Sequence, residues 1–257
     1  MDYAESRVYQ PGDDVRRLDW RLTARSGKLH TKLFQEDREA SLLIVLDTHA
    51  SMRFGTRVRF KSVQAARVAA AAAWQAVRAG ERVGVMAFGR ASQWLRPQAG
   101  PRGALAVCGA LAGWDRAPDG EEQGESLSDA LMRAARVMHG ASRVLLVSDG
   151  FSCDPAARQR LLELGRKARV AVAVVADALE LAPAAPGRYP VEHDGERQDV
   201  VLQSDRQRAE FQQVLGAGPA RLARLARECG ARCATVDTAA DAFDAVGSLL
   251  SARGASR

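Results

Sequence analysis

Short apolar runs that stop abruptly at polar residues alternate along this chain with longer stretches of helical periodicity. The first run, Leu42 to Leu46, ends at Asp47. A short continuous apolar run bounded by polar residues is typical of a buried strand in a parallel sheet. Similar runs predict strands at 83–88, 143–148, 170–176 and 232–236, with 93–96 as a short hairpin partner of the strand at 83–88.

The stretches between these runs repeat their apolar residues with the period of a helix. They predict helices at 60–79, 102–112, 127–138, 155–167, 206–229 and 240–250. Strands that alternate with such helices form βαβ units with right-handed crossovers. We therefore predict an α/β fold of Rossmann type, with a mostly parallel central sheet of about six strands and helices on both faces.

Two segments depart from this alternation. Residues 1–38 precede it and are predicted to form an N-terminal extension packed on the main domain, which covers residues 39–252. Residues 178–204 interrupt it with a Pro-rich stretch and a turn at Asp194-Gly195, which predicts a protruding hairpin insertion.

The extension has helix and strand signals of its own. Asp13 and Asp14 follow a Pro-Gly turn and can cap a helix from about Val15 to Arg25. Gly27 suits the end of that helix. The alternation of polar and apolar residues from Lys28 to Phe34 is typical of an edge strand.

Composition limits the classes of protein to which this chain can belong. With 257 residues, of which 47% are hydrophobic, the chain can bury the core of one large domain with an extension. The net charge of +6 comes mainly from arginines that are interleaved with acidic residues. Because the charges form no long basic block and aromatic residues are scarce at 5%, we expect no nucleic-acid partner.

The cysteines and the longest apolar runs indicate the cellular compartment in which we expect the chain. The four cysteines, at positions 108, 153, 229 and 233, form no C-x-x-C pair, so we expect free thiols in a reducing compartment. No apolar run is long enough to span a membrane, and the N-terminus lacks the pattern of a signal peptide. We expect a cytoplasmic chain without a membrane segment.

Candidate chemistry gathers where the predicted strands end. Asp47 and Ser51 follow the first strand, Asp149 follows the strand at 143–148, and Ser126 precedes a helix. Ligands of open α/β sheets bind outside the carboxyl ends of the strands, so these four side chains are expected to converge, with Asp47 exposed. Carboxylates and hydroxyls are hard oxygen ligands, so the set predicts a divalent cation, Mg²⁺ or Mn²⁺.

The set resembles the metal-ion-dependent adhesion site of von Willebrand factor A (vWA) domains, which has an Asp-x-Ser-x-Ser motif, a later Thr or Ser, and a second Asp. The first Ser of that motif is His49 in this chain. A water fills its place, His49 itself shifts the preference toward nitrogen-tolerant ions, or no metal binds. Alternatively, Asp47 and Ser51 only cap the loop and helix that follow.

A second resemblance covers nearly the whole chain. The stretch RVYQPGDDVRRLDWR, residues 7–21, is similar to the signature of a bacterial and archaeal family related to vWA domains and called domain of unknown function fifty-eight. Further matches are Thr23-Ala24-Arg25, Leu29-His30-Thr31-Lys32, Phe60-Lys61, Gly84, Phe88-Gly89, Ser148-Asp149 and Gly187-Arg188-Tyr189.

This resemblance implies a function as well as a fold. Members are often encoded beside MoxR-type AAA+ ATPases, which implies a non-enzymatic protein-interaction module that acts as an adaptor in chaperone-like maturation, with a degenerate metal site. Many members carry two transmembrane helices and a strand before the signature, and we expect neither in this chain.

The N-terminal signature has two interpretations. Its charged residues and Trp20 can form a docking surface for a partner, or a buried ion-pair lattice with Trp20 packed on the sheet edge. We favour the second, because paired opposite charges often satisfy one another. The charged residues concerned are Asp13, Asp14, Arg16, Arg17 and Asp19.

The alternative function is a metal-dependent hydrolase or phosphatase that uses Asp47. Haloacid-dehalogenase phosphatases also place an Asp after the first strand, but they need a second Asp where this chain has His49. The sequence contains no nucleophile elbow and no P-loop. An interaction module is therefore the leading hypothesis, and the hydrolase stays open beside it.

Overall fold

The computed structural model describes residues 2–11, 13–15, 18–35, 40–90, 92–115, 124–138, 142–193 and 196–251. Contacts divide the chain into two compact units, Met1–Glu39 and Ala40–Arg257. The packing of the extension on the main domain stays a prediction.

The N-terminal unit is a two-stranded antiparallel sheet with one helix. Strand β1 (Asp2–Val8) pairs with β2 (His30–Gln35), and α1 (Trp20–Ser26) lies between them in the chain. The predicted edge strand is therefore confirmed. Strand β1 contains no glycine and runs into the signature at Arg7, and it supplies the partner that β2 needs.

Helix α1 begins later than the sequence predicted. Its N-cap is Asp19, whose side chain accepts a hydrogen bond from Leu22 N, whereas Asp13 accepts one from Gln10 N and pairs with Arg7. Several acids in this segment satisfy the capping rule, and the tertiary contacts select Asp19. Gly27 ends the helix with φ +70°, as expected.

The described part of the signature shows which of its side chains are buried and which are exposed. Asp19 is buried and accepts a hydrogen bond from Ser6, and the partly exposed Asp13 pairs with Arg7, so the buried ion-pair lattice stays a prediction. Trp20 is 68% exposed, because α1 buries none of its residues, and its packing on the sheet edge of the other unit stays a prediction. Arg16 and Arg17 lie outside the described residues.

The main domain is built on a six-stranded sheet with the order β10-β7-β6-β3-β4-β5. Adjacent strands run parallel except β4 and β5, so the predicted mostly parallel sheet is confirmed. The strands are β3 (Ser41–Asp47), β4 (Arg82–Phe88), β5 (Trp94–Gln98), β6 (Ser142–Ser148), β7 (Ala168–Ala176) and β10 (Arg232–Asp237).

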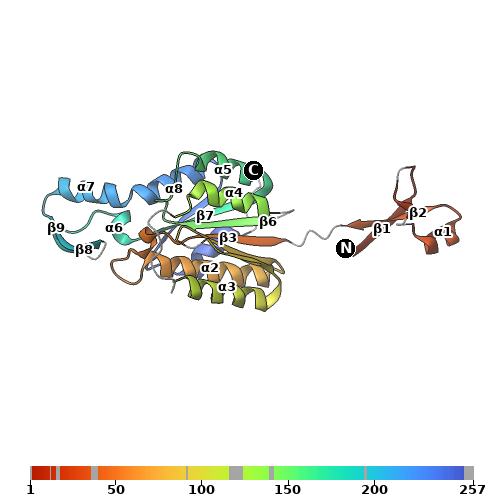
Figure 1. Ribbon diagram of the computed structural model, residues 1–257, viewed down its shortest axis with the longest axis horizontal. Helices are drawn as coiled ribbons and strands as arrows, with labels where there is room; N and C mark the ends of the chain where they lie inside the picture. The colour runs from red at the N-terminus through yellow and green to blue at the C-terminus, as the bar shows by residue number, and fades with distance from the viewer. Residues whose placement is uncertain are drawn as a thin grey trace. The chain divides into compact units, whose positions relative to one another are not determined.

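Helices cover both faces of this sheet (Figure 1). One face packs on α2 (Lys61–Arg78), α3 (Gly100–Asp115) and α9 (Ala242–Leu250), and the other on α4 (Leu127–Val137), α5 (Ala157–Lys167) and α8 (Ala217–Glu228). Within β3, Leu42 and Ile44 belong to the first face and Leu43 and Val45 to the second. Because both sides are buried, the strand has no polar alternation, which is why its apolar run is continuous.

The predicted insertion after β7 is a hairpin. It contains α6 (Ala178–Leu181), β8 (Gly187–His193) and β9 (Glu196–Leu202), and α7 (Asp205–Leu215) follows. The predicted turn at Asp194-Gly195 lies outside the described residues. The stretch 206–229, predicted to be largely helical, forms the two helices α7 and α8, which meet at Gly216. A Cβ at Gly216 would lie 2.6 Å from Glu180 O.

Two further expectations concern membranes and thiols. In the described ranges, no helix combines the length and the apolar character that crossing a membrane requires. All four cysteines are free thiols, as the sequence predicted.

Candidate functional site

Two of the predicted site residues, Asp47 and Asp149, lie where neighbouring strands end at the carboxyl edge of the sheet. Asp47 ends β3 and Asp149 follows β6, and these two strands are parallel neighbours. Ser148 Oγ donates to Asp47 Oδ2 at 2.6 Å and joins the two strand ends. Ser126 N-caps α4. The predicted convergence of the strand ends on one edge is thus what the topology produces.

Asp47 is enclosed rather than exposed. Its Oδ1 accepts from His49 N at 3.0 Å and is 2.7 Å from His49 Nδ1, and its Oδ2 accepts from Ser148 at 2.6 Å and Ser152 at 2.9 Å. The side chain has no exposed surface, so the expected exposure is wrong. A carboxylate offers about four lone-pair positions, and all of them are engaged.

His49 is turned toward Asp47 rather than toward a ligand position. Its ring also packs edge-on against Phe88, with 5.7 Å between the ring centroids. Burial alone lowers the pKa of His49, but the hydrogen bond and the charge of Asp47 outweigh it and raise the pKa above its ordinary value. Gly89 makes room for the ring, since a Cβ there would lie 2.6 Å from His49 Nδ1.

The two serines of the predicted set differ. Ser126 accepts from Asp129 N at 3.2 Å and donates to Asp129 Oδ2 at 2.9 Å, so it serves the first turn of α4. Ser51 lies in the short helix η2 (Ala50–Arg53), and its Oγ is buried without a hydrogen-bond partner among the described residues. Of the four predicted ligands, Ser51 is the one with an unengaged oxygen.

Asp149 forms an ion pair with the side-chain ammonium group of Lys61. Lys61 Nζ lies 2.8 Å from Asp149 Oδ2 and 2.6 Å from Glu180 Oε1, and all three side chains are at least 98% buried. The rings of Phe54 and Phe151 flank the ammonium, with centroids 5.5 and 5.3 Å from Nζ. Burial raises the pKa of Glu180, and the charge of Lys61 opposes that rise.

Sequence reasoning missed Lys61 and Glu180 as members of this site. One signal for Lys61 was available: it is the first residue of α2, where the helix dipole disfavours a cation. A lysine in that position points to acidic partners elsewhere in the fold.

The arrangement does not fit a divalent cation. A hard cation needs protein oxygens that are free to bind it, with water filling the rest of its six or more positions, whereas Asp47 is saturated, Asp149 carries an ammonium and Ser126 caps a helix. The described residues also contain no group of three or more His, Cys, Asp or Glu side chains that could hold a metal ion. The metal at Asp47, Ser51, Ser126 and Asp149 stays a prediction that this donor set does not favour.

Residues 54–60 form a loop that is anchored at this edge. Lys61 N donates to Phe54 O at 2.8 Å and closes the loop. Thr56 N and Oγ1 donate to the buried Asp177 at 3.0 and 2.5 Å, and Arg59 donates to Thr238 O at 2.9 Å. These contacts tie the loop to the carboxyl ends of β7 and β10.

The anchored loop exposes apolar side chains. Val58 is 57% exposed and Phe60 is 53% exposed. Phe151, which follows β6, is 40% exposed and contacts the same ammonium as Phe54 does. We call Val58, Phe60 and Phe151 the apolar rim. All three belong to the carboxyl edge, Val58 and Phe60 on the anchored loop and Phe151 after β6, and large apolar side chains exposed in one region of a surface are characteristic of interaction sites.

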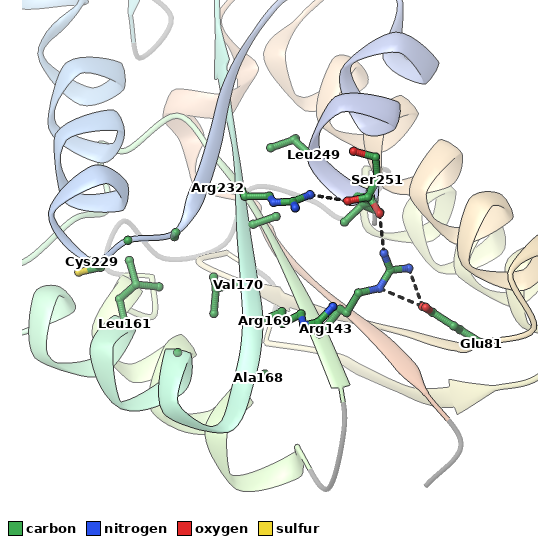
Figure 2. Close-up of a pocket in the computed structure, with 15 residues that line it drawn as sticks. Glu81, Arg143, Leu161, Ala168, Arg169, Val170, Cys229, Arg232, Leu249 and Ser251 are labelled. Carbon is green, nitrogen blue, oxygen red and sulfur yellow. Dashed lines mark hydrogen bonds and ion pairs between the residues drawn. The ribbon is translucent and has the colours of Figure 1, made fainter. Parts of the chain in front are cut away.

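A hollow of about 600 Å³ lies at the opposite edge, among the starts of β6, β7 and β10 (Figure 2). Arg143 pairs with Glu81 and donates to Leu250 O at 2.9 Å, and Arg232 donates to Ser251 O. These arginines cap the last carbonyls of α9, where a positive charge suits the helix dipole. The hollow therefore has a structural account and is not the candidate site.

The family model described as "Protein of unknown function DUF58" matches residues 5–218. The chain belongs to this family. An uncharacterized protein of Mycobacterium tuberculosis, Rv1480, is 44% identical over 82 residues, which are 32% of this chain and 26% of that protein. Uncharacterized protein YeaD of Bacillus subtilis is 41% identical over 51 residues, 20% of this chain and 13% of that protein. The matched part thus spans about a quarter or less of these relatives.

Solved structures share the fold at low sequence identity. An aerotolerance-related membrane protein from Bacteroides fragilis is 16% identical with a TM-score of 0.55, covering 82% of this chain and 96% of that chain. BatB from Bacteroides thetaiotaomicron is 15% identical with a TM-score of 0.53, covering 80% and 95%. A fainter likeness, with a TM-score of 0.43, is to a von Willebrand factor type A structure from Catenulispora acidiphila. The predicted mostly parallel α/β fold is confirmed by the sheet and by the first two of these structures.

Proposed function

We propose that this chain is a non-enzymatic protein-interaction module that binds its partner through the apolar rim. The observation that carries the proposal is the exposure of Val58 and Phe60 on a loop that hydrogen bonds anchor to the buried Asp177. A rigid loop loses little conformational entropy on binding, so its exposed apolar groups contribute more to affinity. The carboxyl edge is also where open α/β sheets bind ligands.

The state of Asp47 supports a role without catalysis. A nucleophilic carboxylate needs an accessible oxygen, and both oxygens of Asp47 are enclosed by four hydrogen-bonding atoms. A phosphatase assay with generic substrates tests the alternative hydrolase. Turnover that is lost in Asp47→Asn would establish that alternative.

The partner that we propose is a MoxR-type AAA+ ATPase in the cytoplasm. The family resemblance carries this part of the proposal. Such a partner would use this chain as an adaptor toward the proteins that it remodels.

The test replaces the two exposed side chains of the loop. We expect Val58→Asp with Phe60→Asp to weaken binding of the MoxR-type ATPase from the same organism by about tenfold or more, because charges replace apolar contacts at the rim. Biolayer interferometry with the purified proteins measures the affinity. Thermal unfolding should stay cooperative, since neither side chain belongs to the core.

Leu105→Asp is the matched control. Leu105 is 59% exposed but lies on α3, outside the rim. Its replacement should leave the affinity unchanged. Equal affinities of the rim variant and the wild type would contradict the proposal.

A further inference from the structure

We propose that Lys61 is the resident cation of this site and that the carboxyl edge is complete without a divalent metal ion. The ammonium takes the position that a metal would otherwise hold beside Asp149. This inference concerns the chain by itself and does not depend on which partner it binds.

The contacts of Lys61 are those of a cation in a built site. Its Nζ makes charge-assisted hydrogen bonds of 2.8 Å to Asp149 and 2.6 Å to Glu180. The Lys61 side chain is 1% exposed, and lysine is almost never so buried unless it is paired. The faces of Phe54 and Phe151 add cation–π contacts on its remaining sides.

The surrounding backbone supplies hydrogen-bond donors to the remaining carboxylate oxygens. Two carboxylates share one ammonium, and each also accepts a backbone hydrogen bond. Phe151 N donates to Asp149 Oδ1 at 3.1 Å, and Asp177 N donates to Glu180 Oε2 at 2.7 Å. Every oxygen of the two carboxylates therefore has a donor, as buried charges require.

A metal ion would have to share this space with the ammonium. Two positive centres a few ångströms apart repel each other strongly where water is excluded. The metal would also have to displace donors from Asp47, which accepts from Ser148 and Ser152. The wild-type arrangement is thus closed to a second cation.

The position of Lys61 gives the ammonium a structural task. Lys61 directly follows the loop at 54–60 and opens α2, while Asp149 follows β6 and Glu180 lies in α6. One side chain thereby joins three elements at the edge. The loop that presents Val58 and Phe60 of the apolar rim is held by a covalently attached cation and needs no exchangeable one.

The first arm of the test titrates the wild-type protein with Mg²⁺, Mn²⁺ and Ca²⁺ at millimolar concentration, and separately with EDTA. We expect the thermal midpoint to stay within about 1 °C and calorimetry to detect no saturable binding. A saturable wild-type response that is lost in Ser51→Ala would overturn the proposal.

The second arm removes the ammonium. Lys61→Ala should lower the midpoint, and at mildly alkaline pH the freed carboxylates should take up Mn²⁺ or Ca²⁺, which raises the midpoint again by about 5 °C. The same variant with Asp149→Asn and Glu180→Gln should lose this rescue. If Lys61→Ala folds and its thermal midpoint does not change with any of the three ions, that result would count against a cation position beside Asp149 and Glu180.

Lys167→Ala is the matched control. Lys167 donates to Ala135 O at an exposed position at the end of α5, so its loss should create no response to divalent ions. If Lys61→Ala does not fold, Lys61→Ala with Glu180→Gln replaces it in the same titration, because this pair leaves one uncompensated charge instead of two.

Discussion

Asp177→Ala is expected to lower the free energy of unfolding by about 3–5 kcal/mol, because hydrogen bonds to a charged group contribute about 1.5–3 kcal/mol each and are not additive. Asp177 has no exposed surface and accepts four hydrogen bonds. The donors are Thr56 N, Thr56 Oγ1, Leu179 N and Thr238 Oγ1. Alanine would leave these donors without an acceptor and detach the loop at 54–60 from β7.

Urea unfolding followed by circular dichroism measures this loss. Asp241→Ala is the control, because Asp241 caps α9 at an exposed position and its removal should cost only about 1 kcal/mol. If the two variants lose equal stability, the network around Asp177 does not support the fold as described.

The same carboxylate gives a prediction for acidic pH. Burial alone raises the pKa of Asp177, but the hydrogen bonds, led by those from Thr56, outweigh it and hold the pKa below its ordinary value of 3.8. A lowered pKa means that the stabilisation is complete above the unfolded value and is lost as the pH falls through the folded value.

The stability difference between wild type and Asp177→Ala should therefore be constant near neutral pH and shrink only below about pH 4. Urea midpoints of both proteins between neutral and acidic pH measure it. A difference that already shrinks near neutral pH would show that another titrating group is responsible.

Gly150→Ala is expected to lower the free energy of unfolding by about 3–5 kcal/mol, the range of backbone strain combined with a clash in the core. Gly150 has φ +83°, which is unfavourable for other residues. A Cβ there would lie 2.2 Å from Gly218 O and 2.6 Å from Leu222 Cβ, both on α8. Since this contact is with backbone, the strand end or α8 must move.

Chemical denaturation measures the loss, and Gly109→Ala is the control. Gly109 lies in α3 with open space around its Cα, so alanine should stabilise the protein by about 0.5–1 kcal/mol. A Gly150→Ala protein with wild-type stability would contradict the close packing of α8 on the turn after β6. The displacement should also disturb Asp149 and Phe151, which flank the glycine.

Much of the fold follows from the local pattern. The run from Leu42 to Leu46 predicted β3, because a strand covered by helices on both faces must be apolar at every position. The parallel topology then required Asp47 and Asp149 to lie at one edge. These features depend on burial and chain direction, which the order of residues encodes.

Other features depended on contacts between distant segments. The predicted start of α1 was wrong. Several acids in this segment fit the capping rule, and the contacts made as β1 pairs with β2 select Asp19. The exposure of Trp20 could not be predicted from the sequence, because an aromatic residue in a charged segment suits a core and a surface equally.

The candidate site likewise has some features that the sequence determined and others that only the tertiary structure decided. The sequence by itself determined that carboxylates and hydroxyls would gather at the carboxyl edge, because parallel strands deliver their ends to one side. Only the tertiary structure decided that Lys61 pairs with Asp149 and Glu180, which are 88 and 119 residues away. Periodicity reports which face of a helix is buried, but it does not report which distant charge a buried ammonium will meet.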